Sequence, residues 1–279
     1  MADLLVVGSA NLDISVPVAE LPLPGETVLG GDALWSPGGK GANQAVAAAR
    51  LGRSVSFAGC VGDDDAGRQL RDALAADDVE WAGAVLPEVP SGIAMIAVAD
   101  DGENSITVSP GANARVDAAL VSAAIEQAEP TVVLSQFEVP LAAVASACAE
   151  LTAVLAAATV IVPNQGELAQ LLGVDRAEEV DDLVRQAREL PTPQVVVTLG
   201  SRGALVVTDT IAELVPPLAV QAIDTTAAGD AFCGGLADAL ADSADLVEAA
   251  RWGARVAAVA VTRRGAQVSL GTRADALAL

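Results

Sequence analysis

Short apolar runs along the chain alternate with longer segments of helix-forming composition. Leu4–Gly8 is an apolar run that ends in glycine, which is typical of a buried strand. Gly41–Leu51 has the composition of a helix, Val55–Cys60 predicts a second strand, and Ala66–Ala76 predicts a second helix. The first third of the chain therefore contains buried strands that are separated by helices.

From Asp117 onward, the alternation of strands and helices becomes regular. The predicted strands are Thr131–Leu134, Thr159–Val162, Gln194–Leu199, Ala204–Val207, Glu213–Val215 and Ala219–Ile223. The predicted helices are Asp117–Ala128, one after Pro140, Glu167–Leu172, Glu178–Glu189, Ala228–Leu240 and Leu246–Val261. This alternation predicts an α/β fold with a doubly wound, mostly parallel sheet.

Some strand-rich segments in the first 110 residues do not follow this alternation. Leu21–Pro37 is rich in proline and glycine and predicts a hairpin or flap, and Gly92–Ala99 and Ser105–Ser109 read as two strands around a turn. We expect a small β-sheet that projects as a lid, built from about residues 14–37 and 88–109. Because no linker or repeat interrupts the sequence, residues 1–279 are expected to form a single domain.

Composition limits the possible chemistry. Of the 279 residues, 52% are hydrophobic, so a large core can form, and there is no histidine, which excludes Ser-His and Cys-His triads. The formal net charge of −22 opposes binding to nucleic acid or to an anionic membrane, so neither partner is expected. An anionic substrate must instead be held by backbone amides or by a single placed cation, and the only lysine is Lys40.

The cysteines and the N-terminus indicate a cytoplasmic protein. Cys60, Cys148 and Cys233 are widely spaced and odd in number, which favours a reducing compartment. The N-terminus has no basic region before its first apolar run, so no signal peptide is expected. The stretch Leu141–Val162 is apolar but contains Glu150, which favours a helix followed by a strand over a membrane span.

The strongest local signal is Asp224-Thr225-Thr226-Ala227-Ala228-Gly229-Asp230, which lies between a predicted strand and a helix. Small residues at 227–229 allow a ligand to approach the backbone, and the free amides of a helix N-terminus attract anions. Asp230 is placed to accept a proton from a substrate hydroxyl, so this turn has the parts that phosphoryl transfer needs. The alternative is that Asp230 only complements the helix dipole and that the small residues only pack tightly.

The second signal, Gly38-Gly39-Lys40-Gly41-Ala42-Asn43, also opens a helix. Lys40 and Asn43 are polar groups suited to a polyhydroxylated ligand. The segment is not a Walker A loop, because Gly41 rather than serine or threonine follows the lysine. The alternative is an ordinary junction between a strand and a helix.

Polar residues also follow the ends of other predicted strands. They are Asn11 and Asp13, Glu138, Asn164 and Glu167, and the turn Thr198-Leu199-Gly200-Ser201-Arg202-Gly203. Taken alone, the pair Asn11 and Asp13 is more typical of a polar turn, and the pair Asn164 and Glu167 is more typical of a helix cap. Glu138 is either a site residue or a solvated acid, and the 198–203 turn either wraps a nucleotide or is a glycine hairpin. Together they lie at the carboxyl ends of strands, where open α/β sheets bind ligands.

These motifs resemble those of the ribokinases, within the PfkB family of carbohydrate kinases. The matching segments are residues 38–52, 224–230, 9–13, 24–27, 61–67, 109–113, 136–138, 164–167, 198–203 and 260–269, in family order. The resemblance implies a ribokinase-like fold and transfer of the γ-phosphoryl group of ATP to the primary hydroxyl of a pentose, with D-ribose as first candidate. The alternatives are another family substrate (a nucleoside, fructose or a sugar phosphate) and a non-catalytic sugar or nucleotide sensor.

The resemblance also implies roles for individual residues. Asp230 would be the catalytic base, beside an anion hole formed by the amides of Ala227, Ala228 and Gly229. Sugar hydroxyls would bind to Asn11, Asp13, Gly39, Lys40, Asn43, Glu138 and Asp230. ATP would bind to Asn164, Thr198, Gly200, Ser201, Gly203 and Gly229.

Two metal ions and a dimer are implied in the same way. Glu167 would act on Mg²⁺ through water. A monovalent cation, K⁺, would lie beside the anion hole at Asp224, Thr226, Ala260, Arg263, Gly265 and Ser269. The lid would make the contact of a homodimer.

One segment departs from the family pattern. Between Pro140 and Asn164 the chain is shorter than the resemblance implies, by a strand and the loop that follows it. Loss of an inner strand leaves strand edges unpaired. Either a shorter crossover closes up the sheet, or a loop is missing from the sequence and the numbering runs on across it. We favour the second explanation, which predicts a Cα–Cα separation well above ~3.8 Å near Glu150–Leu151.

Overall fold

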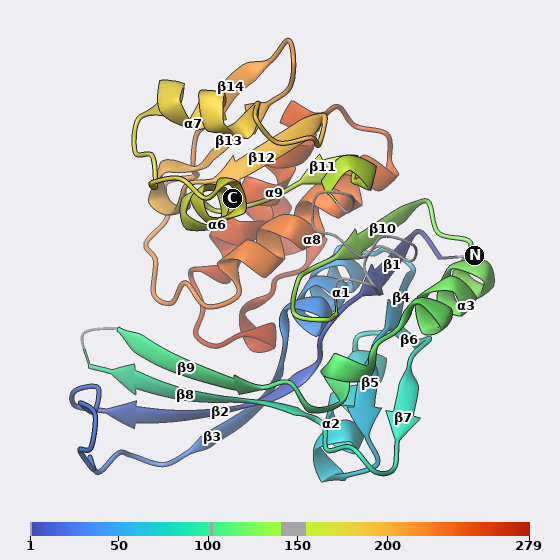
Figure 1. Ribbon diagram of the computed structural model, residues 1–279, viewed down its shortest axis with the longest axis vertical. Coiled ribbons are helices and arrows are strands. Elements are labelled where there is room, and N and C mark those ends of the chain that lie inside the picture. Colours follow the sequence, from blue (N-terminus) through green and yellow to red (C-terminus); the bar gives the residue numbers. More distant parts are fainter. Residues whose placement is uncertain (1, 101–102, 141–154) are drawn as a thin grey trace.

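The protein is described by a computed structural model that covers residues 2–100, 103–140 and 155–279. The described strands form two central sheets, a separate lid sheet and a small two-stranded sheet, with helices packed around the central sheets (Figure 1). No described helix has an apolar stretch long enough to span a membrane.

One central sheet is entirely parallel and contains the N-terminal strand. Its order is β10 (Val132–Ser135), β1 (Leu4–Val7), β4 (Val55–Ala58) and β6 (Glu80–Trp81). The helices packed on it are α1 (Lys40–Arg50), α2 (Asp65–Ala76) and α3 (Ala118–Ala128). Alternate side chains of β1 point to opposite faces, so Leu4 and Val6 join the core with α1 and α2, whereas Leu5 and Val7 join the core with α3. Both faces of this sheet are therefore covered.

The second central sheet repeats this arrangement. Its order is β11 (Val160–Ile161), β12 (Gln194–Thr198), β13 (Ala204–Val207) and β14 (Ala212–Val215), of which the last two pairings are antiparallel. The helices around it are α6 (Gln165–Leu172), α7 (Val180–Ala187), α8 (Ala228–Ala241) and α9 (Leu246–Ala260). Val195 and Val197 of β12 pack with α6 and α7, and Val196 packs with α8 and α9. The doubly wound α/β class predicted from the sequence is confirmed.

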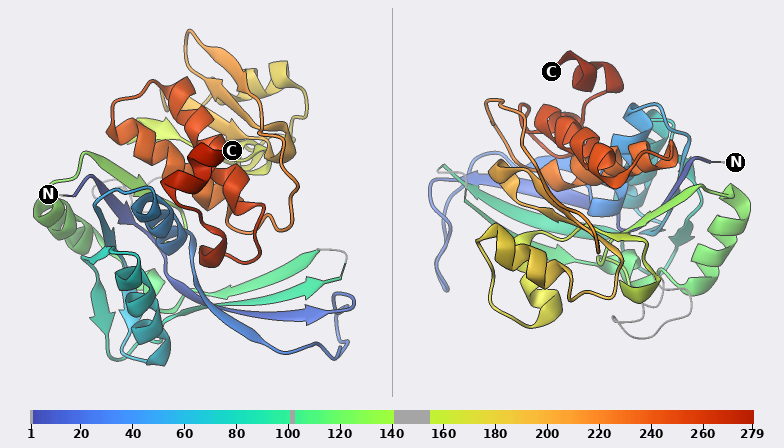
Figure 2. Two further views of the ribbon diagram at one scale, coloured as in Figure 1. Left: turned by 180° about the vertical axis from the view of Figure 1, so that it is seen from behind. Right: turned by 90° about the horizontal axis from the view of Figure 1, so that it is seen from above.

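The lid is a four-stranded sheet that extends away from the helices (Figures 1 and 2). Its order is β3 (Leu34–Gly38), β2 (Asn11–Val18), β8 (Gly92–Ala99) and β9 (Asn104–Ser109). The remaining elements are β5 (Cys60–Gly62), β7 (Ala84–Leu86), the short 3-10 helices Gly111–Arg115, Gly200–Arg202 and Gln267–Ser269, and α10 (Arg273–Ala278). Because only three residues separate β1 from β2, the lid is attached directly to the carboxyl end of a central strand.

The structure corrects two details of the expected strands. Residues 219–223 form no strand: they are largely exposed, and the hydrogen bond from the amide of Ile223 goes to the carbonyl oxygen of Val261 beyond α9 instead of to a sheet. The expected strand Val55–Cys60 is divided at Gly59 into β4 and β5, which pair with different neighbours.

The two central sheets are not hydrogen-bonded to each other among the described residues. β10 and β11 each pair with a described strand on one side only. The chain break expected near Glu150–Leu151 lies outside the described residues.

A buried carboxylate fastens α8 to three other segments. Asp238 is only 1% exposed and accepts hydrogen bonds from Arg53, from Arg273 of α10 at 2.6 Å and from the indole of Trp252 on α9 at 2.6 Å. Arg53 also pairs with the exposed Asp242. Removing Asp238 would leave the guanidinium groups of Arg53 and Arg273 without their shared buried carboxylate.

We expect Asp238→Ala to lower the free energy of unfolding by about 3 kcal/mol or more, because an uncompensated charge remains in a buried network. Urea denaturation measures this loss. Asp242→Ala, which removes an exposed partner of the same arginine, is the matched control and is expected to shift the midpoint much less. Equal effects of the two variants would contradict a central role for Asp238.

Candidate active site

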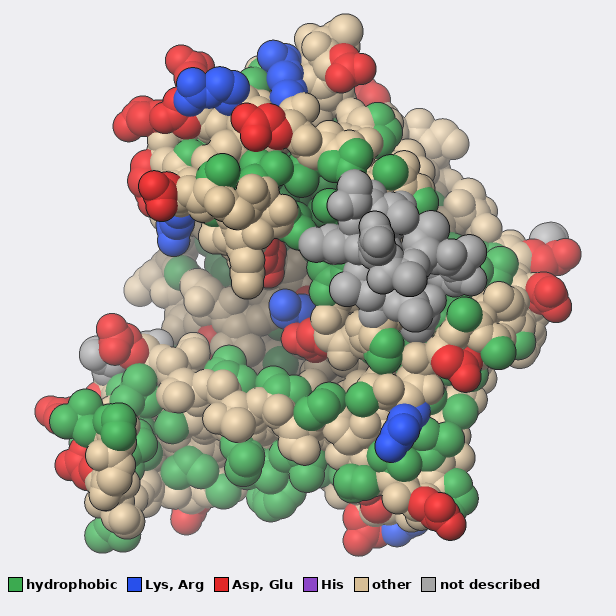
Figure 3. Space-filling model, viewed as in Figure 1, with side chains coloured by type: hydrophobic (Ala, Val, Ile, Leu, Met, Phe, Trp, Pro, Cys, Tyr) green, Lys and Arg blue, Asp and Glu red, His purple; other side chains and the backbone are tan. Residues whose placement is uncertain are grey.

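The polar residues singled out in the sequence meet between the lid and the two central sheets. They lie after the carboxyl ends of β1, β10, β11 and β12 and at the N-termini of α1 and α8. Figure 3 shows a hollow here between the lid and the lobe above it, with charged side chains of both signs at its inner end.

Glu138 is fixed at the inner end of this region by three contacts. Its Oε2 accepts a hydrogen bond from the Ser9 hydroxyl at 2.6 Å and from the Lys40 amide at 3.3 Å. The ammonium of Lys40 lies 3.7 Å from its Oε1. The chain thus brings residues after β1 and β10 together with the first residue of α1.

Asn11 and Asp13 lie two residues apart at the start of β2 and share one face of the lid sheet. The carboxamide of Asn113, which is 1% exposed, donates to the Asn11 side chain at 2.8 Å and accepts from the amide of Ala10. Gly38 lies against Asp13: a Cβ there would be 2.1 Å from its carboxylate. Glycine at this position therefore leaves room for the acid.

Asp230 lies in the first turn of α8 and is 8% exposed. The Asn43 side chain donates to its Oδ2 at 2.9 Å, and the Gln44 side chain donates to its Oδ1 at 3.0 Å. Burial raises the pKa of Asp230 to about 6, against the opposing effect of these two hydrogen bonds. The group is therefore mostly ionised at neutral pH and remains able to take up a proton.

The N-terminus of α8 has free backbone donors beside this carboxylate. Ala227, which precedes the helix, has a φ of 58°, a left-handed conformation that is strained for alanine. The Ala228 amide donates to the carbonyl oxygen of Thr225 at 3.2 Å, whereas the amides of Ala227 and Gly229 have no partner within the described part of the chain. Two of the three predicted amides are thus available to an anion.

The residues expected around a nucleotide lie on two adjacent loops. Asn164 and Thr198 form a parallel bridge at the ends of β11 and β12. Gly200 and Gly203 have φ values of 59° and 91°, and a Cβ at Gly203 would come within 2.1 Å of the carbonyl oxygen of Val215. Ser201 lies between these glycines in an exposed turn.

Asn164 and Glu167 form a capping box at the start of α6. The Asn164 side chain accepts from the Glu167 amide, and the Glu167 carboxylate accepts from the Asn164 amide, both at 2.9 Å. This is the helix-cap alternative that the sequence left open. The exposed Glu167 is nevertheless close enough to α8 for its charge, with those of Asp230 and Lys40, to act on the Cys233 thiol.

Asp224 holds the loop before α8 to the loop after α9. Its Oδ2 accepts from the Gly265 amide at 2.8 Å, and its Oδ1 accepts from the amide and hydroxyl of Thr226. Although burial opposes its charge, these donors lower the pKa of Asp224, so it stays ionised. Ser269, in contrast, donates to the carbonyl oxygen of Ala266, and Arg263 pairs with Asp275.

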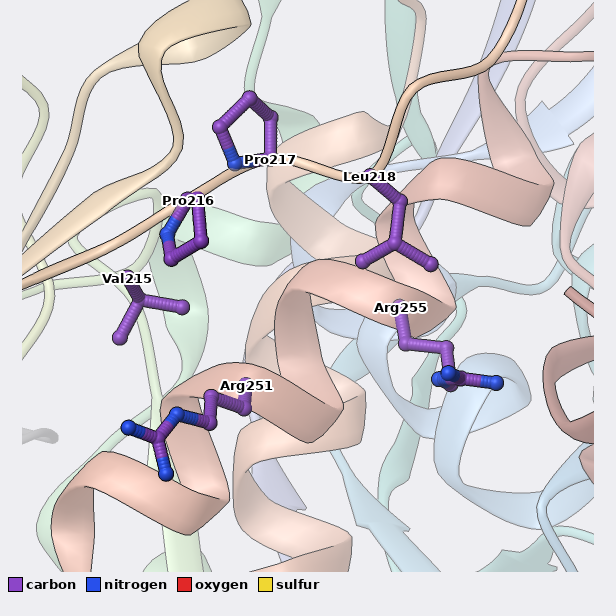
Figure 4. Close-up of a pocket in the computed structure, with 6 residues that line it drawn as sticks. All are labelled: Val215, Pro216, Pro217, Leu218, Arg251 and Arg255. Carbon is purple, nitrogen blue, oxygen red and sulfur yellow. The ribbon is translucent and has the colours of Figure 1, made fainter.

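A separate cavity of about 300 Å³ lies between the segment after β14 and α9 (Figure 4). It is lined by Val215, Pro216, Pro217, Leu218, Arg251 and Arg255. None of these is a predicted site residue. Arg251 pairs with Glu213, and Arg255 donates to the carbonyl oxygen of Ala276, so both cationic groups are already engaged.

Four residues at the site were not assigned a role from the sequence: Ser9, Gln44, Asn113 and Gln136. All four lie inside or beside motifs that were recognised. Their partners are distant in sequence, as with Asn113 and Ala10, which are 103 residues apart. The only signal available beforehand was their polar character within otherwise apolar surroundings.

The carboxylates of Asp13, Glu138 and Asp230 lie within electrostatic reach of one another. Burial, then the charges of Glu138 and Asp230, raise the pKa of Asp13 from 3.8 to about 7. Between these values the folded protein holds a proton that the unfolded chain releases. Stability therefore falls as the pH rises from about 4 to about 7, and the ionised Asp13 destabilises the fold above that range.

We therefore expect Asp13→Asn to raise the thermal unfolding midpoint by several degrees at pH 8 and by much less at pH 5. Calorimetry at both pH values measures the difference. Asp209→Asn removes the same charge from an exposed turn and is the control for net charge. A variant that is destabilised at pH 8, or equally stabilised at both pH values, would contradict the assigned cost of the buried carboxylate.

Comparison with known proteins identifies the family of the chain. The sequence matches the family described as pfkB family carbohydrate kinase over residues 1–148 and 134–273. Ribokinase of Haemophilus influenzae is 36% identical, with 98% of this chain and 97% of the relative covered, and ribokinase of Schizosaccharomyces pombe is 35% identical, with 97% and 95% covered. Among solved structures, ribokinase of Giardia lamblia superposes with a TM-score of 0.91 at 26% identity, covering 99% and 98%. Ribokinase of Arabidopsis thaliana, complexed with ribose and ATP, gives 0.83 at 29% identity, again covering 99% and 98%. The chain belongs to the PfkB family of carbohydrate kinases.

Proposed function

We propose that this carbohydrate kinase transfers the γ-phosphoryl group of ATP to the primary hydroxyl of D-ribose and forms ribose 5-phosphate. The observation that carries the proposal is the first turn of α8, where the buried carboxylate of Asp230 lies beside the free amides of Ala227 and Gly229. A proton acceptor and an anion site are thus provided by the same helical turn. The relatives named as ribokinases support the choice of sugar.

In this reaction Asp230 accepts the proton of the attacking hydroxyl, which its raised pKa of about 6 favours near neutral pH. The amides of Ala227 and Gly229 donate hydrogen bonds to the phosphoryl oxygens during transfer. Ala228 contributes through the helix dipole, because its own amide already has a partner.

The remaining polar residues of the region hold the sugar. Asn11, Asp13, Glu138 and the side chain of Asn43 offer acceptors and donors to hydroxyl groups. Gly39 would contact the sugar through its backbone; a Cβ there would lie 2.7 Å from the amide nitrogen of Asn11, so glycine lets the start of α1 pack against the start of β2. The Oδ1 atom of Asn43 is buried without a partner among the described residues, and a ligand hydroxyl would satisfy it. Lys40 provides the single positive charge.

The charge of this region selects a neutral ligand. Asp13, Glu138 and Asp230 outnumber Lys40, so an anionic sugar would meet net repulsion. Hydroxyl groups, in contrast, donate hydrogen bonds to carboxylates. This argues for a neutral pentose and against a sugar phosphate as acceptor.

For ATP, we propose that Asn164, Thr198, Gly200, Ser201 and Gly203 line the binding loops, with Gly229 at the γ-phosphate. Glu167 has one carboxylate oxygen engaged in the α6 cap, and the other has no hydrogen-bond partner among the described residues, which suits an indirect contact to Mg²⁺ through water. The ion would neutralise phosphate charge, which matters in a chain of net charge −22.

A K⁺ ion is proposed next to the turn that precedes α8. The ionised Asp224, Thr226 and the loop through Gly265 lie together there, and oxygen donors with one negative charge suit a monovalent cation. Ala260, Arg263 and Ser269 would contribute backbone carbonyls. Such an ion would add positive potential behind the anion site.

A homodimer through the lid is also proposed. Trp35, Ile14 and Met95 are in register on the face of the lid opposite to Asp13, and Trp35 and Met95 are 62% and 52% exposed. Exposed apolar groups in one patch are typical of a protein interface.

Cys60 and Cys233 are free thiols, which supports the expected reducing, cytoplasmic compartment.

The reaction is tested with a coupled assay of ADP formation. With D-ribose, ATP and Mg²⁺ we expect turnover that increases when K⁺ is added, and less turnover with fructose, a nucleoside or fructose 6-phosphate. Asp230→Asn should lower kcat by about 10²-fold or more while ribose binding stays measurable by calorimetry. Asp209→Asn is the control; an Asp230→Asn enzyme within a few-fold of wild type would contradict the role of the base.

The dimer is tested by light scattering at micromolar concentration. The double variant Trp35→Glu/Met95→Glu is expected to be monomeric, because it places charges in the apolar face. Leu277→Glu changes a comparably exposed leucine on α10 and should leave the dimer intact. A wild-type monomer, or a dimer of the double variant, would contradict the proposed contact.

A further inference from the structure

A chain of side-chain amides leads from the first central sheet to Asp230. Gln136, the first residue after β10, donates from Nε2 to Oε1 of Gln44 at 2.6 Å. Gln44 in turn donates from Nε2 to Oδ1 of Asp230 at 3.0 Å. Gln44 is 4% exposed and Asp230 is 8% exposed, so the contact between them is buried.

Two glycines make this chain sterically possible. A Cβ at Gly234, one turn after Asp230 on α8, would lie 2.7 Å from Cβ of Ala47 and 3.2 Å from the carbonyl oxygen of Gln44. A Cβ at Gly8 would lie 2.1 Å from Oε1 of Gln136. The first glycine lets α8 approach α1, and the second leaves space for the Gln136 side chain.

The chemistry of the groups fixes the direction of the chain. A carboxylate only accepts hydrogen bonds, so the Gln44 side chain must turn its NH₂ group to Asp230 and its oxygen to Gln136. Gln136 supplies the donor that holds this orientation. With Asn43 on Oδ2 and Gln44 on Oδ1, each oxygen of Asp230 has one donor and keeps capacity for a hydroxyl proton.

We propose that Gln136 and Gln44 form a hydrogen-bond relay that positions the Asp230 carboxylate for proton uptake. The inference rests on the proposed role of Asp230 and deepens it: the two glutamines are positioning residues, because they act through Asp230 and not on the sugar. Since Glu138 lies two residues after Gln136, the relay also ties the segment that holds the sugar to the base.

The charged groups around Asp230 determine how the relay affects titration. Glu138, which follows β10, raises the pKa of Asp230, and Lys40 of α1 lowers it. Asp13 of β2 and Cys233 of α8 also lie within electrostatic reach. Donation from Gln44 favours the ionised carboxylate, so loss of this donor moves the pKa further up.

The test compares the pH profiles of kcat and KM for Gln44→Met and Gln136→Met with wild type, using D-ribose and ATP between about pH 5 and 9. Methionine keeps the length of glutamine but cannot donate. For Gln44→Met we expect the acid limb of kcat to move up by about one pH unit, a several-fold lower kcat at pH 8, and a ribose KM within about three-fold of wild type. Gln136→Met should produce the same changes to a smaller extent.

The double variant separates a relay from two independent packing effects. In a relay, Gln136→Met adds nothing once Gln44 is methionine, whereas independent effects on kcat multiply. An acid limb of Gln44→Met that coincides with wild type, or multiplying effects in the double variant, would overturn the inference. If Gln44→Met does not fold, the less buried Gln136→Met alone decides, through the presence or absence of the shifted acid limb.

Asp230→Asn, measured in parallel, keeps the two proposals apart. An active Asp230→Asn enzyme would refute the base itself, whatever the glutamine variants do. An inactive Asp230→Asn enzyme together with unchanged profiles for the glutamine variants would refute only the relay.

Discussion

The close contact of α1 with α8 is the constraint on which the site depends. Gly234 brings the two helices together at Ala47 and at the backbone of Gln44. Both helices begin at the same hollow, so this contact fixes Lys40 and Asn43 of one helix relative to Asp230 of the other. A larger side chain at residue 234 would separate the two N-termini, and the sugar-binding groups would lose their register with the base.

A second constraint is electrostatic. Burial of Asp13 and Asp230 near Glu138 raises the pKa of both, which means that the folded protein bears a cost for keeping them ionised. For Asp230, hydrogen bonds from Asn43 and Gln44 reduce that cost without removing it. The backbone of Ala227 also costs folding free energy, because the left-handed conformation in the turn with the free amides is one that alanine disfavours. Both features lower the stability of the fold at the residues that are proposed to bind and deprotonate the substrate.

Much of this arrangement could be predicted from local sequence. Glycine and small residues before helices indicated Gly39 and the 227–229 turn, and alternation of strands and helices indicated the fold class. The strand expected at 219–223 was wrong because its apolar pattern does not reveal that no neighbouring strand lies beside it. The relay through Gln136 and Gln44 could not be predicted, since it joins residues 92 positions apart and depends on where β10 ends relative to α1. The capping box at Asn164 shows the opposite case, in which a local pattern was sufficient.

Helix α8 packs against both lobes of the molecule. Ala231 and Ala237 belong to the core of the first sheet, whereas Phe232 and Leu236 belong to the core of the second. The proposed sugar contacts come largely from segments around the first sheet, and the proposed nucleotide loops follow strands of the second. Helix α8 would thus align ATP, the phosphoryl donor, with the sugar that accepts the phosphoryl group. A small rotation of α8 about its own axis would misalign both reactants at once.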